Sequence, residues 1–396
     1  MCIRDRLWVA RSPVAHNSIV FILPGILYTR IPAGPWTVPV DSHSASVHHS
    51  APNLATYLRD FSITIMQFLD SILARARAER RTIVLAEGDD ARVIAAAHRA
   101  RHDGIAECIL LGSADELHRQ AAKQNLDMDG IRIEDPSASQ YHKSYSDYLH
   151  ELRRHKGMTA EDAQRQARDP LCFADLMLHA GDADGSIAGA VYTTGDRVRS
   201  ALQIIGVQPG FSSVSSFMLM LFEAEHHDPQ QAMLFADCAL IVDPDAAQLA
   251  EIAVSTVQSA ERFLQDEARV AMLSFSTDGS AQHPLVDKVR EATRLARAQL
   301  PGIAIEGEVQ LDAAIVPAVA RQKIADSKIG GRANVLIFPD LEAGNIGYKI
   351  AQRFGAATVI GPILQGLKRP ANDLSRGCST EEVYNLIALT AVQATG

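Results

Sequence analysis

The apolar positions that follow residue 66 alternate between helix-like and strand-like segments. In Phe68–Ala78 the apolar residues fall on one helical face, and Thr82–Ala86 is a short apolar run typical of a buried strand. The next pair is a predicted helix over Asp90–Arg101 and a predicted strand over Glu107–Leu111. This strand–helix–strand order is typical of a parallel sheet with crossover helices.

The same order recurs further along the chain. The pattern predicts strands at Ala232–Val242, Val270–Ser274, Asn334–Phe338 and Ala357–Ile360, and helices at Ala246–Leu264, Lys288–Leu300, Asn345–Phe354 and Glu381–Ala394. The predicted fold class is therefore α/β.

Ligands of open α/β sheets bind beyond the carboxyl ends of the strands. Four polar loops occupy such positions after predicted strands: Glu87-Gly88, Asp243-Pro244-Asp245, Ser276–Gly279 and Pro339-Asp340. For each loop taken alone, ordinary turn chemistry is the simpler interpretation.

Residues 1–65 differ from the rest of the chain. They lack clean periodicity and are rich in Pro, Ser and His, and the apolar run Ile19–Leu27 is interrupted by Pro24 and Gly25. We interpret this segment as a non-native or disordered extension, with Met66 as a plausible natural start.

Composition narrows the classes of protein. A chain of 396 residues with 47% hydrophobic residues suits one large or two medium domains. The formal net charge of −9 argues against nucleic-acid binding, and no apolar stretch is long enough to cross a membrane. The five cysteines show no C-x-x-C spacing, which favours a reduced, cytoplasmic setting. We expect no metal site, and we interpret His226-His227-Asp228 as a surface loop.

The segment Gly361–Ser379 reads as one loop punctuated by Gly and Pro, with three cations, Lys368, Arg369 and Arg376. A predicted helix follows it directly. Helix N-termini present free N–H groups and the positive end of the helix dipole. Beside Ser375 and Arg376, this arrangement predicts a place to hold phosphate or an acyl oxyanion.

This segment closely resembles the C-terminal motif of the phosphate acetyltransferases. Further stretches similar to that family are Gly181–Gly185, Ala201–Ile205, Phe235–Ala239, Ser274–Ser280 and Asn334–Lys349. The resemblance runs from about residue 66 to the end, and several ordered motifs are more specific than a single glycine pattern.

The resemblance implies two three-layer α/β domains with mainly parallel sheets and an interdomain cleft, similar to the isocitrate/isopropylmalate dehydrogenase-like fold. It places a discontinuous first domain at residues 66–210 plus 363–396, and a second domain at residues 211–362.

The resemblance also implies reversible transfer of an acetyl group between acetyl-CoA and inorganic phosphate, giving acetyl phosphate and CoA. The CoA thiolate attacks directly in a ternary complex. CoA and phosphate are substrates, so no cofactor is expected. A homodimer and a functional link to acetate kinase are expected as well.

By this resemblance Arg376 clamps phosphate and the reacting carbonyl, and Ser375 donates a hydrogen bond to the transition state. We expect Arg153, Arg199, Asn345 and Gly377 to bind substrate. The simpler interpretations are a surface ion pair for Arg376, a turn hydroxyl for Ser375, and a solvated helix face for Arg153.

Glu382 stands where the family usually has Asp, the presumed base for the CoA thiol. A free thiol has a pKa of ~8.5, so a base or a cationic site must assist it. However, Ser379-Thr380-Glu381-Glu382 also matches a capping box, in which Glu382 bonds the N–H of Ser379. Both roles stay open, and Glu381 is the alternative base.

Three other functions remain as alternatives. A phosphate butyryltransferase would differ in the volume of its acyl pocket. A non-catalytic acyl-CoA-sensing domain is disfavoured because no nucleotide-binding domain is recognisable before Met66. A dehydrogenase of similar fold would need a metal-binding aspartate set, which we cannot assemble.

Overall fold

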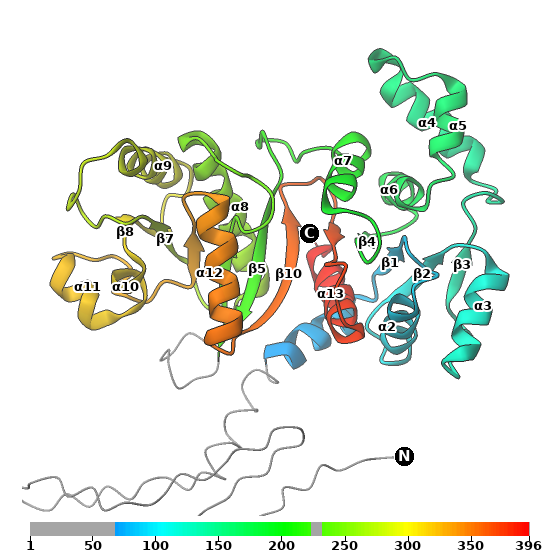
Figure 1. The fold of residues 1–396 in the computed structure, drawn as a ribbon, viewed down its shortest axis with the longest axis horizontal. Helices are drawn as coiled ribbons and strands as arrows, with labels where there is room; N and C mark the ends of the chain where they lie inside the picture. Colours follow the sequence, from blue (N-terminus) through cyan, green and yellow to red (C-terminus); the bar gives the residue numbers. More distant parts are fainter. Residues whose placement is uncertain (1–67, 223–231, 396) are drawn as a thin grey trace, which may run out of the picture. The chain divides into compact units, whose positions relative to one another are not determined.

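A computed structural model describes residues 68–222 and 232–395 (Figure 1). The predicted extension, residues 1–65, and the motif His226-His227-Asp228 lie outside the described residues. No described helix is long and apolar enough to cross a membrane.

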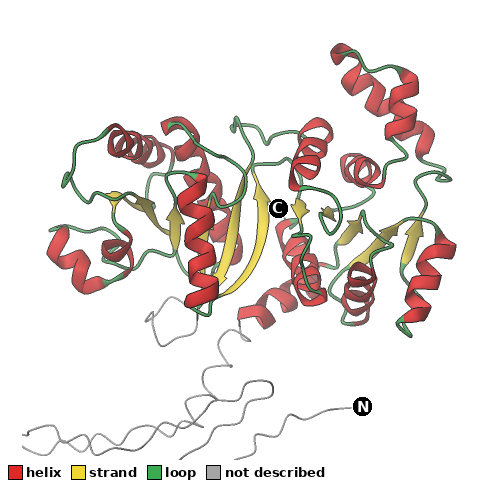
Figure 2. Ribbon diagram, viewed as in Figure 1, coloured by secondary structure: helices red, strands yellow, loops and turns green. Residues whose placement is uncertain are grey.

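Two separate sheets organise the described residues, and helices surround both of them (Figure 2). The five-stranded sheet has the order β11-β4-β1-β2-β3, and the six-stranded sheet has the order β10-β5-β6-β9-β7-β8. The first sheet consists of β1 (Thr82–Leu85), β2 (Glu107–Leu111), β3 (Arg132–Glu134), β4 (Gly185–Ala188) and β11 (Ala371–Asp373). The second consists of β5 (Ser215–Leu221), β6 (Ala232–Ala236), β7 (Arg269–Leu273), β8 (Ala304–Val309), β9 (Val335–Ile337) and β10 (Thr358–Gln365).

The helices begin with an unlabelled one over residues 68–79. Those of the first half are α2 (Ala91–His102), α3 (Ala114–Lys123), α4 (His142–Arg153), the 3₁₀ turn η1 (Arg154–Lys156), α5 (Ala160–Gln166), α6 (Pro170–Ala180) and α7 (Thr194–Ile204). Those of the second half are α8 (Ala246–Phe263), α9 (Pro284–Gln299), α10 (Leu311–Ile315), α11 (Pro317–Lys323), α12 (Leu341–Phe354) and α13 (Thr380–Gln393).

Side chains of the five-stranded sheet alternate between two cores, as the two-residue period of a strand requires. Ile83 and Leu85 pack with α2 and α13, whereas Val84 packs with α4 and α6. The six-stranded sheet does the same: Phe217 faces α8 and Met218 faces the side of α10. Each sheet is therefore the middle of three layers, which confirms the α/β fold class.

Parallel pairing dominates but is not universal. All pairs in the five-stranded sheet are parallel, and so are β6·β9, β9·β7 and β7·β8. The pairs β10·β5 and β5·β6 are antiparallel. Sequence reasoning assigned no element to β5, although this strand is buried throughout.

Two sequence predictions need correction. The strand predicted over Ala232–Val242 ends at Ala236, because the carboxylate of Asp237 accepts hydrogen bonds from the N–H groups of residues 239–241 and folds them into a turn. The single loop predicted over Gly361–Ser379 contains the end of β10 and all of β11. Because β11 pairs with β4 in the buried sheet, it separates Lys368 and Arg369 from Arg376.

The predicted domain boundaries are not tested and stay predictions. The five-stranded sheet takes strands from residues 82–188 and, after the predicted second domain, from 371–373. Strand β10 of the other sheet continues through the predicted boundary at residue 363 to Gln365.

Candidate active site

Three loops come together at the carboxyl edge of the five-stranded sheet. Strands β11, β4 and β1 are neighbours there, and they end at Asp373, Ala188 and Leu85. The loops that follow are residues 86–90, 189–193 and 374–379. They form the kind of edge at which open α/β sheets bind ligands.

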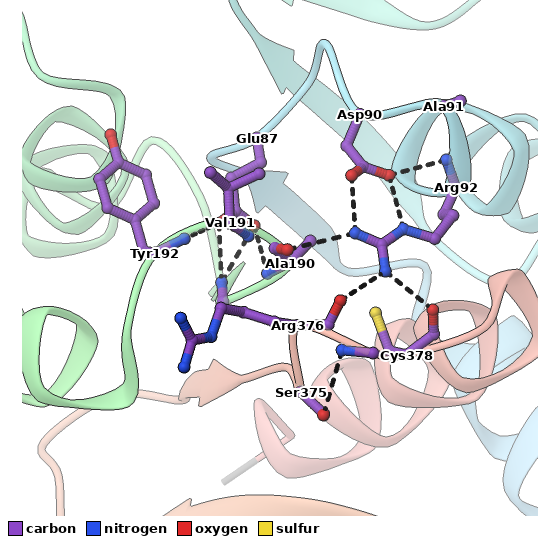
Figure 3. A network of polar contacts seen from close by, with 12 residues as sticks. Glu87, Asp90, Ala91, Arg92, Ala190, Val191, Tyr192, Ser375, Arg376 and Cys378 are labelled. Carbon is purple, nitrogen blue, oxygen red and sulfur yellow. Dashed lines mark hydrogen bonds and ion pairs between the residues drawn. The ribbon is translucent and has the colours of Figure 1, made fainter.

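The carboxylate of Glu87 fixes the loop after β4. Its two oxygens accept hydrogen bonds of 2.7–3.1 Å from the backbone N–H groups of residues 189–192 (Figure 3). The side chain is only 4% exposed. Burying a carboxylate is costly unless hydrogen bonds replace its water, so these four donors and Glu87 stabilise one loop geometry.

Arg92, at the start of α2, ties all three loops together. Its Nη1 donates to the carbonyl oxygens of Arg376 and Cys378, both at 2.9 Å, and its Nη2 donates to the carbonyl of Ala190 at 3.2 Å. Asp90, the N-cap of α2, holds the guanidinium through Nε and Nη2 (Figure 3). The hydrogen bond from Arg92 lowers the pKa of the Asp90 carboxyl, and the same bond raises the pKa of Arg92.

Ser375, Arg376 and Gly377 form an exposed tip on this loop. The hydroxyl of Ser375 accepts a hydrogen bond from the N–H of Gly377 at 3.3 Å. Within residues 68–222 and 232–395, the Arg376 guanidinium has no hydrogen bond or ion pair, and it points away from Arg92 (Figure 3). Arg376 is thus held by its backbone, while its charge stays available to a ligand.

The capping box predicted at the start of α13 is present. The Ser379 N–H donates to Oε2 of Glu382 at 2.6 Å, and the Glu382 N–H donates to the Ser379 hydroxyl at 3.2 Å. Oε1 of Glu382 has no hydrogen bond within the described part of the chain. Glu381, the alternative base, forms an ion pair with Arg99. The cap is therefore formed, and the base role of Glu382 stays a prediction.

No described contact joins the other three predicted residues to Arg376. Arg199 is exposed on α7 and pairs with Asp196 at 2.7 Å. Arg153 ends α4, and its buried Nε finds no hydrogen-bond partner in the described residues. Asn345, on α12, donates to the Cys238 carbonyl at 3.0 Å and accepts from Lys349 at 2.6 Å. Substrate binding by these residues stays a prediction.

The sequence is similar to those of known proteins over most of its length. The sequence profile of the family described as phosphate acetyl/butaryl transferase matches residues 67–391. Phosphate acetyltransferases of Clostridium acetobutylicum and Acetivibrio thermocellus are 45% and 47% identical over 329 residues, which is 83% of this chain and 99% and 98% of those proteins. The chain belongs to the phosphate acetyl/butaryl transferase family.

Solved structures of the family agree with the fold described here. A phosphotransacetylase from Streptococcus pyogenes superimposes with a TM-score of 0.80 at 43% identity, covering 84% of this chain and 99% of that one. The EutD phosphotransacetylase from Staphylococcus aureus gives a TM-score of 0.76 at 43% identity, covering 82% and 99%.

This member of the phosphate acetyl/butaryl transferase family also has site residues that sequence reasoning missed. Glu87 lies in a loop that was noted but interpreted as ordinary turn chemistry. Arg92 had no local signal, because its carbonyl partners lie 284 and 286 residues further along the chain. No cluster of three His, Cys, Asp or Glu side chains suited to a metal ion occurs among the described residues.

Asp373 is a second residue that was missed. It ends β11, is 1% exposed, and accepts a hydrogen bond from the Thr194 hydroxyl at 2.6 Å. Its Oδ1 has no partner within residues 68–222 and 232–395. Burial, with a smaller effect of the charge on Glu87, raises its pKa to about 6, against the opposing effects of Thr194 and Arg197. The last strand before Ser375 thus ends in a carboxyl group that resists ionisation.

We predict that Asp373→Asn gains stability relative to wild type as pH rises. Because the native pKa of Asp373 lies near 6 rather than 3.8, the folded protein keeps a proton that the unfolded chain releases. Wild-type stability therefore falls from about pH 4 to pH 6, by up to about 3 kcal/mol, whereas Asn cannot titrate. Urea unfolding at pH 4 and pH 7 measures this difference, with the exposed Asp129→Asn as control. An Asp373→Asn effect that is equal at both pH values would contradict the prediction.

Proposed function

We propose that the protein is a phosphate acetyltransferase, which transfers an acetyl group reversibly between acetyl-CoA and inorganic phosphate. Three relatives are matched by this chain over nearly their whole length, and each of them is named phosphate acetyltransferase. The structural observation that carries the proposal is the guanidinium of Arg376, which has no partner within residues 68–222 and 232–395 and stands on a loop held by Arg92.

In the direction of acetyl-CoA synthesis, the CoA thiolate attacks the carbonyl carbon of acetyl phosphate. A C–S bond forms, the bond from that carbon to the phosphate oxygen breaks, and phosphate leaves with the bonding electrons. Negative charge develops on the carbonyl oxygen in the transition state, so a positioned cation and hydroxyl stabilise it there. Arg376 and Ser375 are the exposed groups suited to this role, and Arg376 also suits the phosphate group.

The thiol proton must leave before or during the attack. We assign it to Oε1 of Glu382, because Oε2 of the same carboxylate is engaged by the Ser379 N–H. The two roles that the sequence left open are then compatible, since one oxygen serves the cap and the other accepts the proton. By family resemblance we assign substrate binding to Gly377 of this loop and to Arg153, Arg199 and Asn345. The reaction as written requires no metal or organic cofactor.

The exposed side chains of helix α12 support a homodimer. On α12 only Gly344 is fully buried, while Ile346, Ile350 and Phe354 are 57%, 53% and 88% exposed at four-residue spacing. Such a stripe of large apolar side chains marks an interaction surface. We propose that a second copy of this chain covers it, that the enzyme acts in the cytoplasm, and that acetate kinase uses its acetyl phosphate.

We predict that Arg376→Ala folds normally but loses most of the transfer activity. Removing a charge-assisted contact to the reacting group should cost about 3 kcal/mol or more in the transition state. The assay follows thioester absorbance with CoA and acetyl phosphate, and is then repeated with butyryl phosphate. Arg119→Ala, which removes an exposed ion pair with Glu116, is the control.

Wild-type protein without transfer in this assay would overturn the proposed function and favour an acyl-CoA-sensing role. Butyryl phosphate as the better substrate would identify a butyryltransferase. Near-normal turnover by a folded Arg376→Ala variant would remove Arg376 from the reaction.

We predict that Glu382→Gln lowers turnover by about 10²- to 10⁴-fold near pH 7, as for a lost general base. Gln preserves the cap, because its carbonyl oxygen also accepts from the Ser379 N–H. The deficit should shrink as pH approaches the thiol pKa of ~8.5, where thiolate forms unaided. Glu381→Gln, one residue earlier, is the control and should change turnover little. A pH-independent, near-normal rate for Glu382→Gln would restrict Glu382 to its capping role.

A further inference from the structure

A cavity of about 490 Å³ lies at the amino edge of the five-stranded sheet, away from the three candidate active-site loops. Arg81, Asp184 and Pro370 line it, and each directly precedes one of the strands β1, β4 and β11. The same three strands carry the candidate active site at their other ends. The cavity is thus a separate site, which the proposed reaction does not use.

The lining is strongly cationic. Four positive side chains line the cavity, Arg81, Arg262, Lys368 and Arg369, against the single carboxylate of Asp184. That carboxylate is already engaged, because it pairs with Arg81 at 3.4 Å and accepts from the Thr82 N–H at 2.8 Å. The chain as a whole has a formal net charge of −9, so this local excess runs against the overall balance.

Two of these cations have no partner among the residues that the structure describes. Within the described residues, the side chains of Lys368 and Arg369 make no hydrogen bond or ion pair. They also affect a neighbouring side chain. Burial lowers the pKa of His179, and the charges of Arg369 and Lys368 lower it further. Burial and the charge of Arg75 likewise lower the pKa of Arg262. The positive potential of Lys368 and Arg369 therefore reaches His179 on α6.

The floor of the cavity is polar and fixed. The amide of Gln365 accepts from Ser259 at 2.9 Å and donates to the hydroxyls of Ser215 and Thr256 at 3.0 and 2.8 Å. Gln393 donates to the Leu364 carbonyl at 2.8 Å. Because these groups satisfy one another, the floor needs no ligand to keep its shape. Among the described residues that line the cavity none is aromatic, so the site offers no surface on which a nucleobase could stack.

We propose that this cavity is a second anion-binding site, which takes a compact polyanion with two or more phosphate or carboxylate groups. Guanidinium and ammonium groups are the side chains that recognise such anions. The volume lies within the range of small-molecule sites, about 300–1,000 Å³. Lys368 and Arg369 have no partner among the described residues, and the Asp184 carboxylate is engaged. Together with the fixed floor, these features favour a multiply charged ligand without a nucleoside. This site goes beyond the proposed function and does not depend on it.

Isothermal titration calorimetry with pyrophosphate, in Mg²⁺-free buffer, tests the proposal. Arg376→Ala protein serves as the starting form, because it removes the cation through which pyrophosphate would bind at the candidate active site. We expect this protein to bind pyrophosphate, and the added pair Lys368→Gln and Arg369→Gln to weaken binding at least about tenfold. The control adds Arg321→Gln and Lys328→Gln to the Arg376→Ala protein instead. It makes the same charge change on exposed residues outside the cavity, and the affinity for pyrophosphate should stay within about twofold.

Two results would overturn the proposal: binding of neither pyrophosphate nor citrate to the Arg376→Ala protein, or equal affinities after the two charge-matched double changes. Citrate tests the carboxylate form of the same ligand chemistry, and tight binding of either anion supports the site. Tighter binding of ADP than of pyrophosphate would show that the ligand includes a nucleoside, contrary to the proposal. In the wild-type background, the double change Lys368→Gln and Arg369→Gln should leave transfer activity intact. Transfer activity therefore tests the proposed function, and pyrophosphate binding tests this cavity independently of it.

Discussion

The buried carboxylate of Glu87 is the constraint on which the candidate active site depends. A charge at this depth is tolerated only because four backbone N–H groups replace its hydration. Those donors belong to the loop after β4, so their hydrogen bonds to Glu87 stabilise the path that the loop takes here. That path presents the Ala190 carbonyl to Arg92, which also holds the carbonyls of Arg376 and Cys378. The position of Arg376 is therefore set by a chain of contacts that begins at Glu87.

In this arrangement one arginine holds the loops and a different arginine is left to contact the substrate. Arg92 is fully engaged through Asp90 and three carbonyl oxygens, whereas the Arg376 guanidinium makes no bond within the described residues. Electrostatic stabilisation of a transition state works best when the donor is positioned before the reaction, since no reorganisation is then needed. The five-stranded sheet also separates the cations of this segment between its two edges. Strand β11 places Arg376 at the carboxyl edge, and Lys368 and Arg369 at the amino edge, where the cationic cavity lies.

Local patterns predicted the elements and the residues of single segments well. The apolar run at β1 and the helical face of α2 were recognisable because each depends on neighbours in sequence. The capping box at Ser379 and Glu382 was predicted for the same reason, since its partners are three residues apart. The family resemblance, carried by several ordered motifs, supplied the function.

Contacts between distant segments could not be predicted in this way. The pairing of Arg92 with the Arg376 carbonyl spans 284 residues, and no local pattern marks it. Strand β11 was hidden because its three residues carry Asn372 and Asp373, which look like loop residues until β4 buries them. As a result the three cations of Gly361–Ser379 were grouped together, although the strand divides them between two edges of the sheet.

The contacts of Glu87 and Arg92 predict that the loops at residues 189–193 and 374–379 are held as one unit. Hydrogen exchange of peptides covering both loops, compared between wild type and Arg92→Lys, tests it most directly. Lys keeps the charge but cannot reproduce the guanidinium contacts, and losing charge-assisted hydrogen bonds should speed exchange in both loops by about tenfold or more. Arg119→Lys, at an exposed ion pair, should leave both loops unchanged. Exchange in Arg92→Lys that matches wild type in both loops would show that Arg92 does not hold them together.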